Sequence, residues 1–218
     1  MKLSTSRTLL AVALALGLTA CGGKASFEIR GSIFGLQYPG LKLTETKSGA
    51  VKTIAPTETI FSFGNIDYGT SFDLTIATAD QPLHQFCTVS NGSDTAGRTA
   101  SINITVSCVT NSVSLAGLIK VTPVTGATAG LPTGLKLING SVAPFVAVDG
   151  STTYAFPAVA YGTPYSMIIA AQPTQPSKTT CVFDTTDTTV IVSPDKLSVQ
   201  GTMGDTAPVI NVNCTTTT

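Results

Sequence analysis

The sequence has no tryptophan and a single histidine, and only 11% of its 218 residues are charged. Twelve Lys and Arg residues balance twelve Asp and Glu residues, so the formal net charge is zero. A protein whose main partner is nucleic acid usually carries a clear basic excess. The composition therefore argues against a nucleic-acid partner.

The side chains that carry most enzyme chemistry are also scarce. His84 is the single histidine, and no serine or cysteine nucleophile lies in a recognisable motif with it, so no catalytic triad can be assembled. Asp94, Asp184 and Asp187 could offer oxygens to calcium, but they lack the acidic-loop spacing of known sites. We assign no catalytic, cofactor or metal residue, and we predict a protein that is not an enzyme and uses no cofactor.

The first twenty residues have the organisation of an export signal. Lys2 and Arg7 precede an apolar run over residues 9–16, which is shorter than the ~20 residues needed to span a bilayer. The next segment, Leu18-Thr19-Ala20-Cys21, resembles the lipobox of bacterial lipoproteins. The resemblance implies a signal peptide over 1–20, lipidation of Cys21 and a lipidated linker over 21–26. A plain secretory signal with a coincidental cysteine is the alternative.

A lipid on Cys21 would be enough to hold the protein on a membrane. Two or three acyl chains exceed the one-chain threshold for lasting attachment, because each buried methylene contributes ~0.8 kcal/mol. Gly22, rather than Asp, follows the cysteine, which in the commonest bacterial sorting pattern implies the outer membrane. We expect a lipid-anchored protein of the cell outer membrane that faces either the periplasm or the exterior.

The sequence is rich in threonine and contains an internal repeat. Its 36 threonines are β-branched and favour strands. The Gly-Leu-Lys-Leu motif at 40–43 returns at 134–137, Tyr-Gly-Thr at 68–70 returns at 161–163, and Gln-Pro at 81–82 returns at 172–173. The motifs keep their order, so we expect two repeats, over 27–109 and 113–218.

Each repeat has the alternation of a half-buried sheet. Phe72, Leu74 and Ile76 alternate with more polar residues, as do their counterparts Tyr165 and Met167 in the second copy. About seven short strands per copy indicate an all-β chain with two tandem antiparallel β-sandwich domains of immunoglobulin-like type, although small β-barrels have similar strand counts. The order of motifs is similar to recurrent modules of bacterial surface and secreted proteins. That resemblance implies architecture and location, but no activity.

The cysteines can be paired by strand parity. Lipidation of Cys21 leaves two cysteines in each repeat, which predicts one structural disulfide per domain. If these cysteines face each other on antiparallel strands, Val89 faces Val106 and Phe183 faces Val212, so every pair sets apolar residues on one face. Each bridge would stabilise its domain by about 3–4 kcal/mol in the chain-entropy model. The predicted disulfide residues are Cys87, Cys108, Cys181 and Cys214.

Anchor, repeats and the scarcity of catalytic groups together favour an interaction role. We predict a non-enzymatic surface or envelope lipoprotein that serves as a structural or adhesive module, with its recognition surface on the long loops of the second repeat. The alternative is a module that binds a glycan or another small ligand. The sequence identifies neither the protein or glycan partner nor the oligomeric state, and a fold alone grants no enzymatic activity.

The lipid prediction is tested by replacing the thiol. Cys21→Ser should move the protein from the detergent phase to the aqueous phase in a detergent partition experiment, because the acyl chains have no other attachment point. A Cys21→Ser chain that still partitions with detergent would contradict lipidation at this residue.

Overall fold

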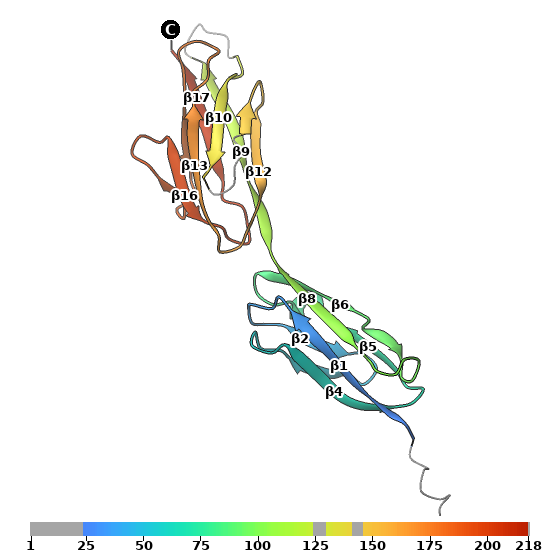
Figure 1. Ribbon diagram of the computed structural model, residues 1–218. Coiled ribbons are helices and arrows are strands. Elements are labelled where there is room, and N and C mark those ends of the chain that lie inside the picture. The colour runs from blue at the N-terminus through green and yellow to red at the C-terminus, as the bar shows by residue number, and fades with distance from the viewer. Residues whose placement is uncertain (1–23, 124–129, 141–145, 218) are drawn as a thin grey trace, which may run out of the picture. The chain divides into compact units, whose positions relative to one another are not determined.

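The computed structural model describes residues 24–123, 130–140 and 146–217, with the side chains of 146–148 left aside. The predicted signal peptide and Cys21 lie outside this range. The described chain divides after Val109 into two compact units, which we call domain 1 and domain 2 (Figure 1). Among the described residues, the single helix is the 3₁₀ turn Thr78–Asp80, and no helix is long and apolar enough to cross a membrane.

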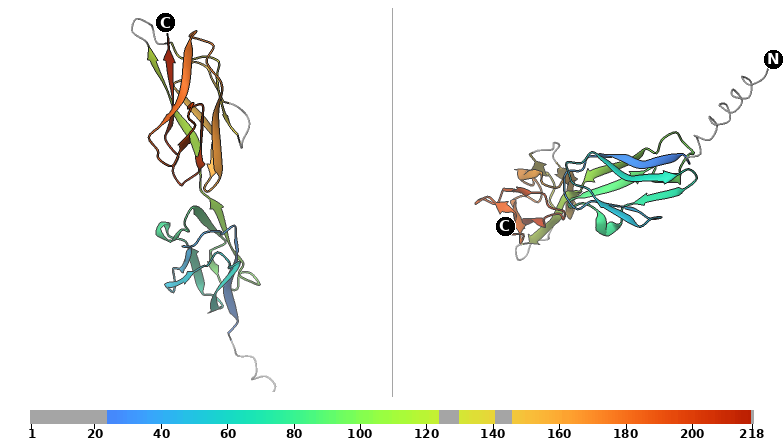
Figure 2. Two further views of the ribbon diagram at one scale, coloured as in Figure 1. Left: turned by 90° about the vertical axis from the view of Figure 1, so that its left-hand side faces the viewer. Right: turned by 90° about the horizontal axis from the view of Figure 1, so that it is seen from below.

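Domain 1 contains eight strands in two four-stranded sheets, ordered β4-β1-β8-β6 and β3-β2-β5-β7 (Figures 1 and 2). The strands are β1 (Ser26–Phe34), β2 (Lys42–Glu45), β3 (Ala50–Thr53), β4 (Ile60–Asp67), β5 (Ser71–Thr75), β6 (Gln85–Ser90), β7 (Ser93–Thr95) and β8 (Ile104–Thr110).

Domain 2 repeats this arrangement with one more strand, and its sheets are ordered β12-β9-β17-β14 and β11-β10-β13-β16-β15. Its strands are β9 (Ser112–Pro123), β10 (Leu135–Asn139), β11 (Val146–Val148), β12 (Thr153–Ala160), β13 (Pro164–Ala171), β14 (Thr179–Thr185), β15 (Ile191–Val192), β16 (Ser198–Thr202) and β17 (Ile210–Thr216). The predicted all-β chain of two sandwiches is confirmed.

The strand order within each domain differs from the immunoglobulin arrangement. In that arrangement the first strand shares a sheet with the second. Here β1 pairs antiparallel with β4 and parallel with β8, and β9 pairs in the same way with β12 and β17. Side-chain alternation shows which face of a strand is buried but not which strand lies beside it, so the sequence left this order open.

Alternation along the strands builds a separate core in each domain. On β8, Ile104, Val106 and Cys108 are buried while Thr105 and Ser107 point outward. The last strand of domain 2 follows the same pattern, with Ile210, Val212 and Cys214 buried. The sequence predicted about seven strands per copy, whereas the domains contain eight and nine strands. The predicted number is too low because β7 and β15, of three and two residues, are too short to show alternation.

One disulfide closes each domain, as predicted. Cys87 bonds Cys108 and Cys181 bonds Cys214, and the two Cα atoms of each bridge are 4.0 Å apart. In domain 2 the register places Cys181 opposite Cys214 and Phe183 opposite Val212, which is the alignment expected from parity.

A buried polar residue ends the second strand of each domain. The Glu45 carboxylate, 3% exposed, accepts hydrogen bonds from the Ser48 amide (2.6 Å) and the Asp73 amide (2.9 Å), and also from Lys47 and the Ser48 hydroxyl. Asn139 occupies the equivalent place, where its Oδ1 accepts the amide of Ser166 at 3.3 Å. Glu45 ties the turn after the second strand to the fifth strand, and Asn139 ties the end of the second strand to the fifth strand of its repeat.

Glu45 makes domain 1 sensitive to acid. Burial alone would raise the pKa of its carboxyl, but the hydrogen bonds from Ser48, Asp73 and Lys47 outweigh burial and lower the pKa below 4.5. Because the folded pKa is depressed, the stabilisation is fully present above pH 4.5 and is lost as the pH falls through the folded pKa.

Glu45→Gln should therefore lower the free energy of unfolding of domain 1 by about 1–3 kcal/mol at pH 7, because a charged acceptor is lost. It should also flatten the acid limb of the stability curve. Amide hydrogen exchange at Ser48 and Asp73 reports both effects, and Asp67→Asn, at an exposed carboxylate, is the matched control. A pH dependence that is identical in Glu45→Gln and the natural chain would refute this role.

Candidate functional site

A glycine lies opposite an aromatic residue at the same place in both domains. Gly31 on β1 pairs with Phe61 on β4, and Gly117 on β9 pairs with Tyr154 on β12. A Cβ at Gly31 would lie 2.6 Å from the Phe61 ring, and one at Gly117 would lie 2.8 Å from the Tyr154 ring. Each would also collide with a carbonyl oxygen of the last strand of its domain. Only glycine leaves room for the ring to enter the core.

Tyr154 uses this space for a hydrogen bond as well as for packing. Its hydroxyl donates to the carbonyl of Ile210 at 2.8 Å, and the side chain is 3% exposed. Burial raises the pKa of the phenol well above its usual range. Tyr154 is therefore a permanent hydrogen-bond donor, and its position links β12 to the last strand.

In domain 1 a hollow of about 560 Å³ lies over β1 and β4 at this glycine. Four of its lining residues are charged, with two of each sign: Glu28, Arg30, Lys52 and Glu58. The Ser62 hydroxyl donates to Glu28 at 2.6 Å, and Arg30 lies 3.8 Å from the same carboxylate. Ile60, which is 71% exposed, adds an apolar edge. The hollow thus combines charges of both signs with one large apolar side chain.

In domain 2 a hollow of about 550 Å³ lies at the equivalent place over β9 and β12. None of its ten lining residues is charged. Leu118 and Val209, 51% and 59% exposed, lie beside the small side chains of Ala116 and Ala155 and beside Pro208. This hollow offers a partner an apolar surface.

The two hollows are the same structural position with different side chains. Relative to the paired glycines, Arg30 corresponds to Ala116, Ser32 to Leu118, Ser62 to Ala155 and Asn103 to Val209. The backbone frame is kept while one charged and three polar side chains are replaced by apolar ones. A hollow of this size is within the range of ~300–1,000 Å³ that binding sites occupy.

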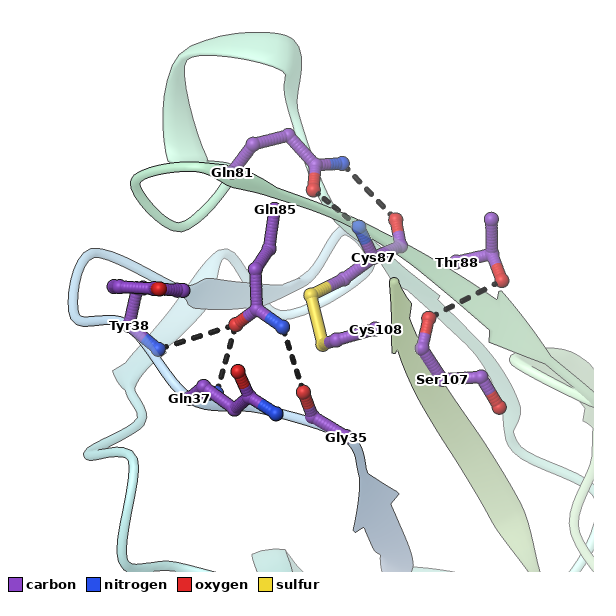
Figure 3. Close-up of a disulfide and its surroundings, with 9 residues drawn as sticks. All are labelled: Gly35, Gln37, Tyr38, Gln81, Gln85, Cys87, Thr88, Ser107 and Cys108. Atoms are coloured by element: carbon purple, nitrogen blue, oxygen red, sulfur yellow. Dashed lines mark hydrogen bonds between the residues drawn. A yellow bond between two sulfur atoms is a disulfide. The ribbon is translucent and has the colours of Figure 1, made fainter. Parts of the chain in front are cut away.

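A glutamine clasp protects the strand edge next to each disulfide, and Figure 3 shows the clasp of domain 1. Gln81 accepts the Cys87 amide at 2.7 Å and donates to the Cys87 carbonyl at 3.0 Å, and Gln172 does the same for Cys181 at 2.8 and 3.0 Å. β6 and β14 are edge strands, so the side-chain amide replaces a missing strand neighbour. The repeated Gln-Pro motif was the sequence signal for this clasp, but sequence reasoning used it only to align the repeats.

A second glutamine anchors the segment after β1. The Gln85 side chain, 3% exposed, accepts the amides of Gln37 and Tyr38 and donates to the carbonyl of Gly35 (Figure 3). It satisfies backbone groups of a loop that has no strand partner there. Its role is therefore architectural.

The other residues weighed from the sequence lie apart from one another. His84 has a positive φ of 59° in a turn, and its ring meets that of Tyr38 edge-on with centroids 5.2 Å apart. Asp94 lies on β7 of domain 1, whereas Asp184 lies on β14 and Asp187 in the turn that follows it. Each of the three carboxylates accepts a hydrogen bond from a side chain of its own domain. No group of three or more potential metal ligands occurs in the described part of the chain.

Comparison with known proteins yields no family. No protein-family model matches the chain, and no curated protein matches it in sequence. Among solved structures it is similar to the major pilin of Streptococcus pyogenes, with a TM-score of 0.32 and 11% identity over 89% of this chain and 99% of that chain. The major pilin T3.2 from Streptococcus pyogenes serotype GAS13637 gives a TM-score of 0.25 and 12% identity over 89% of this chain and 98% of that chain. Both TM-scores are too low to carry a conclusion.

The need for glycine at position 117, beside the hollow of domain 2, is tested by adding a single methyl group. Gly117→Ala should destabilise domain 2 by about 1–3 kcal/mol, because the new Cβ overlaps the Ile210 carbonyl and the Tyr154 ring. Chemical denaturation followed by hydrogen exchange in domain 2 measures the loss. Gly140→Ala, whose Cβ would have no neighbour nearer than 3.5 Å, is the control and should change stability little. Equal effects of the two substitutions would show that the close approach at Gly117 is unimportant.

Proposed function

We propose that the chain is a non-enzymatic, lipid-anchored interaction module of a bacterial cell envelope. The observation that carries this proposal is the pair of equivalent hollows, one lined by charges and the other apolar, on one repeated framework. Duplication followed by a change of surface chemistry is what a protein needs to hold two different contacts. A catalytic role would instead need reactive groups that converge.

The buried polar side chains are consistent with a scaffold. Four polar residues are buried among the described residues, and each one holds backbone or a neighbouring strand. Glu45, Gln85 and Asn139 bond backbone groups, and the Thr179 hydroxyl bonds that of Thr216 across β14 and β17 at 2.9 Å. These groups are engaged in maintaining the fold.

The proposed anchor places domain 1 next to the membrane. With Cys21 lipidated, the five residues 22–26 span less than ~20 Å even when extended. Domain 2 follows domain 1 along the chain. Its apolar hollow is the surface that we assign to a protein partner, since exposed apolar patches are typical of such contacts.

Site-specific photocrosslinking in the bacterium that produces the chain tests the proposal. A photoreactive phenylalanine analogue is placed at Val209 for domain 2, at Ile60 for domain 1, and at Leu83 as a control that is 58% exposed outside both hollows. We expect an adduct with an envelope protein at one or both hollows and none at Leu83.

Two results would contradict the proposal. The first is a yield of adducts at Val209 and Ile60 no higher than at Leu83. The second is specific binding of the soluble 22–218 fragment on a glycan array without any protein adduct, which would support the glycan-binding alternative.

A further inference from the structure

The last strand of the second sheet has a neighbour in domain 2 that is missing in domain 1. β7 and β16 are equivalent, because Phe72 faces Asp94 as Tyr165 faces Gly201. In domain 2, β15 pairs with the outer edge of β16, and Ile191 faces Gln200. In domain 1 the described sheet ends at β7. The extra strand comes from the longer connection 186–197, which replaces the turn at 91–92.

On the outer edge of β7, Ser93 presents backbone groups that a strand would pair with, whereas the Thr95 N–H donates to Asp94 Oδ1 at 2.7 Å and the Thr95 carbonyl accepts the Arg98 amide. The Ala96 amide donates to the Thr70 carbonyl at 2.9 Å and the Leu74 amide to the Gly92 carbonyl at 2.8 Å. By antiparallel alternation, Asp94 then bonds β5 while the N–H and C=O of Ser93 point away from it. No backbone partner for these two groups is found among the described residues. In domain 2 the residue equivalent to Ser93 is Gln200, which pairs with Ile191 on β15.

A hollow of about 430 Å³ lies beside this edge. It reaches the core residue Phe72, and Asp94 is its single charged residue. The rest of its lining is mostly hydroxyl and carboxamide groups that suit a peptide backbone: Asn91, Ser93, Thr95, Thr99, Ser101 and Asn103. An added strand would find polar partners at the rim and apolar contact at the core.

Domain 2 shows which side chains such a strand carries. Val190, next to β15, is 7% exposed in the core, and Val192 packs against the same core. Ile191, between them, is 62% exposed. The strand therefore offers apolar residues at alternate positions toward the core. β6, the other edge on the disulfide side, is clasped by Gln81 at Cys87, whereas β7 has no glutamine clasp in the described part of the chain.

We propose that the outer edge of β7 and its hollow bind an extended strand from a partner polypeptide, with aliphatic side chains at alternate positions, at the place that β15 fills in domain 2. Strand addition to an exposed sheet edge is a recurrent mode of peptide recognition. This inference rests on the proposed role as an interaction module, to which it adds a docking surface and a kind of partner.

The probe is a synthetic peptide with the sequence of residues 188–193, Thr-Thr-Val-Ile-Val-Ser, blocked at both ends. It is titrated into the exported Cys21→Ser chain labelled with ¹⁵N. We expect saturable shifts of the amides of Ser93, Thr95 and residues 99–103. Ser93→Ala keeps the backbone N–H and should bind within about twofold of the natural residue. Ser93→Pro removes this N–H from the solvent side of the edge and should weaken binding at least tenfold.

A second measurement leaves the protein unchanged. The same peptide, N-methylated at the residue equivalent to Ile191, should lose binding as Ser93→Pro does, so a folding defect of Ser93→Pro cannot hide the answer. Absence of binding, equal binding by the methylated peptide, or shifts confined to β16 would overturn the inference. If the chain forms a dimer that Ser93→Pro dissociates, the inference is overturned in favour of a second copy of this chain as the occupant. If a neutral oligosaccharide shifts these amides and the peptide does not, the inference is overturned in favour of a sugar. None of these outcomes alters the crosslinking at Val209 and Ile60, so the two proposals fail separately.

Discussion

The pairing of the first strand with the last strand is the contact on which each domain depends. β1 with β8, and β9 with β17, are the parallel pairs that join the two ends of a repeat inside one sheet. The glycine at this pairing brings the last-strand carbonyl and a cross-strand ring into close approach. The same last strand carries one half of the disulfide. Core, bridge and hollow therefore all follow from one arrangement of backbone.

The sequence predicts much of this arrangement, because side-chain alternation and strand register are local properties. The parity of Phe183 and Val212 around the second cysteine pair predicts the register, because facing residues share a face of the sheet. Alternation at Phe72 and Leu74 predicts a half-buried strand, since side chains on a strand point to opposite faces in turn. These are local properties, and local patterns report them.

The site itself could not be predicted in the same way. The hollows arise where Gly31 and Gly117 meet rings thirty or more residues away in the sequence, and alternation does not identify neighbouring strands. The Gln81 clasp depends on the edge position of β6, which follows from the sheet order. The single signal available was the repetition of Gln-Pro. Cys21 lies outside the described residues, so its lipidation stays a prediction.

The repeats differ where a partner would meet them. Arg30 and Ala116 occupy equivalent backbone positions, yet one is charged and the other apolar. The sheet that ends at β7 in domain 1 gains β15 in domain 2. Buried apolar positions such as Leu43 and Leu137, in contrast, stay apolar. Constancy inside and divergence outside are what a duplicated interaction scaffold requires.

Each repeat is a separately closed copy of one framework, held by its own disulfide. Mass spectrometry of proteolytic peptides from the unreduced protein tests it directly. Linked peptides are expected for Cys87 with Cys108 and for Cys181 with Cys214. Linkage of Cys87 to Cys181, or of Cys108 to Cys214, would contradict it.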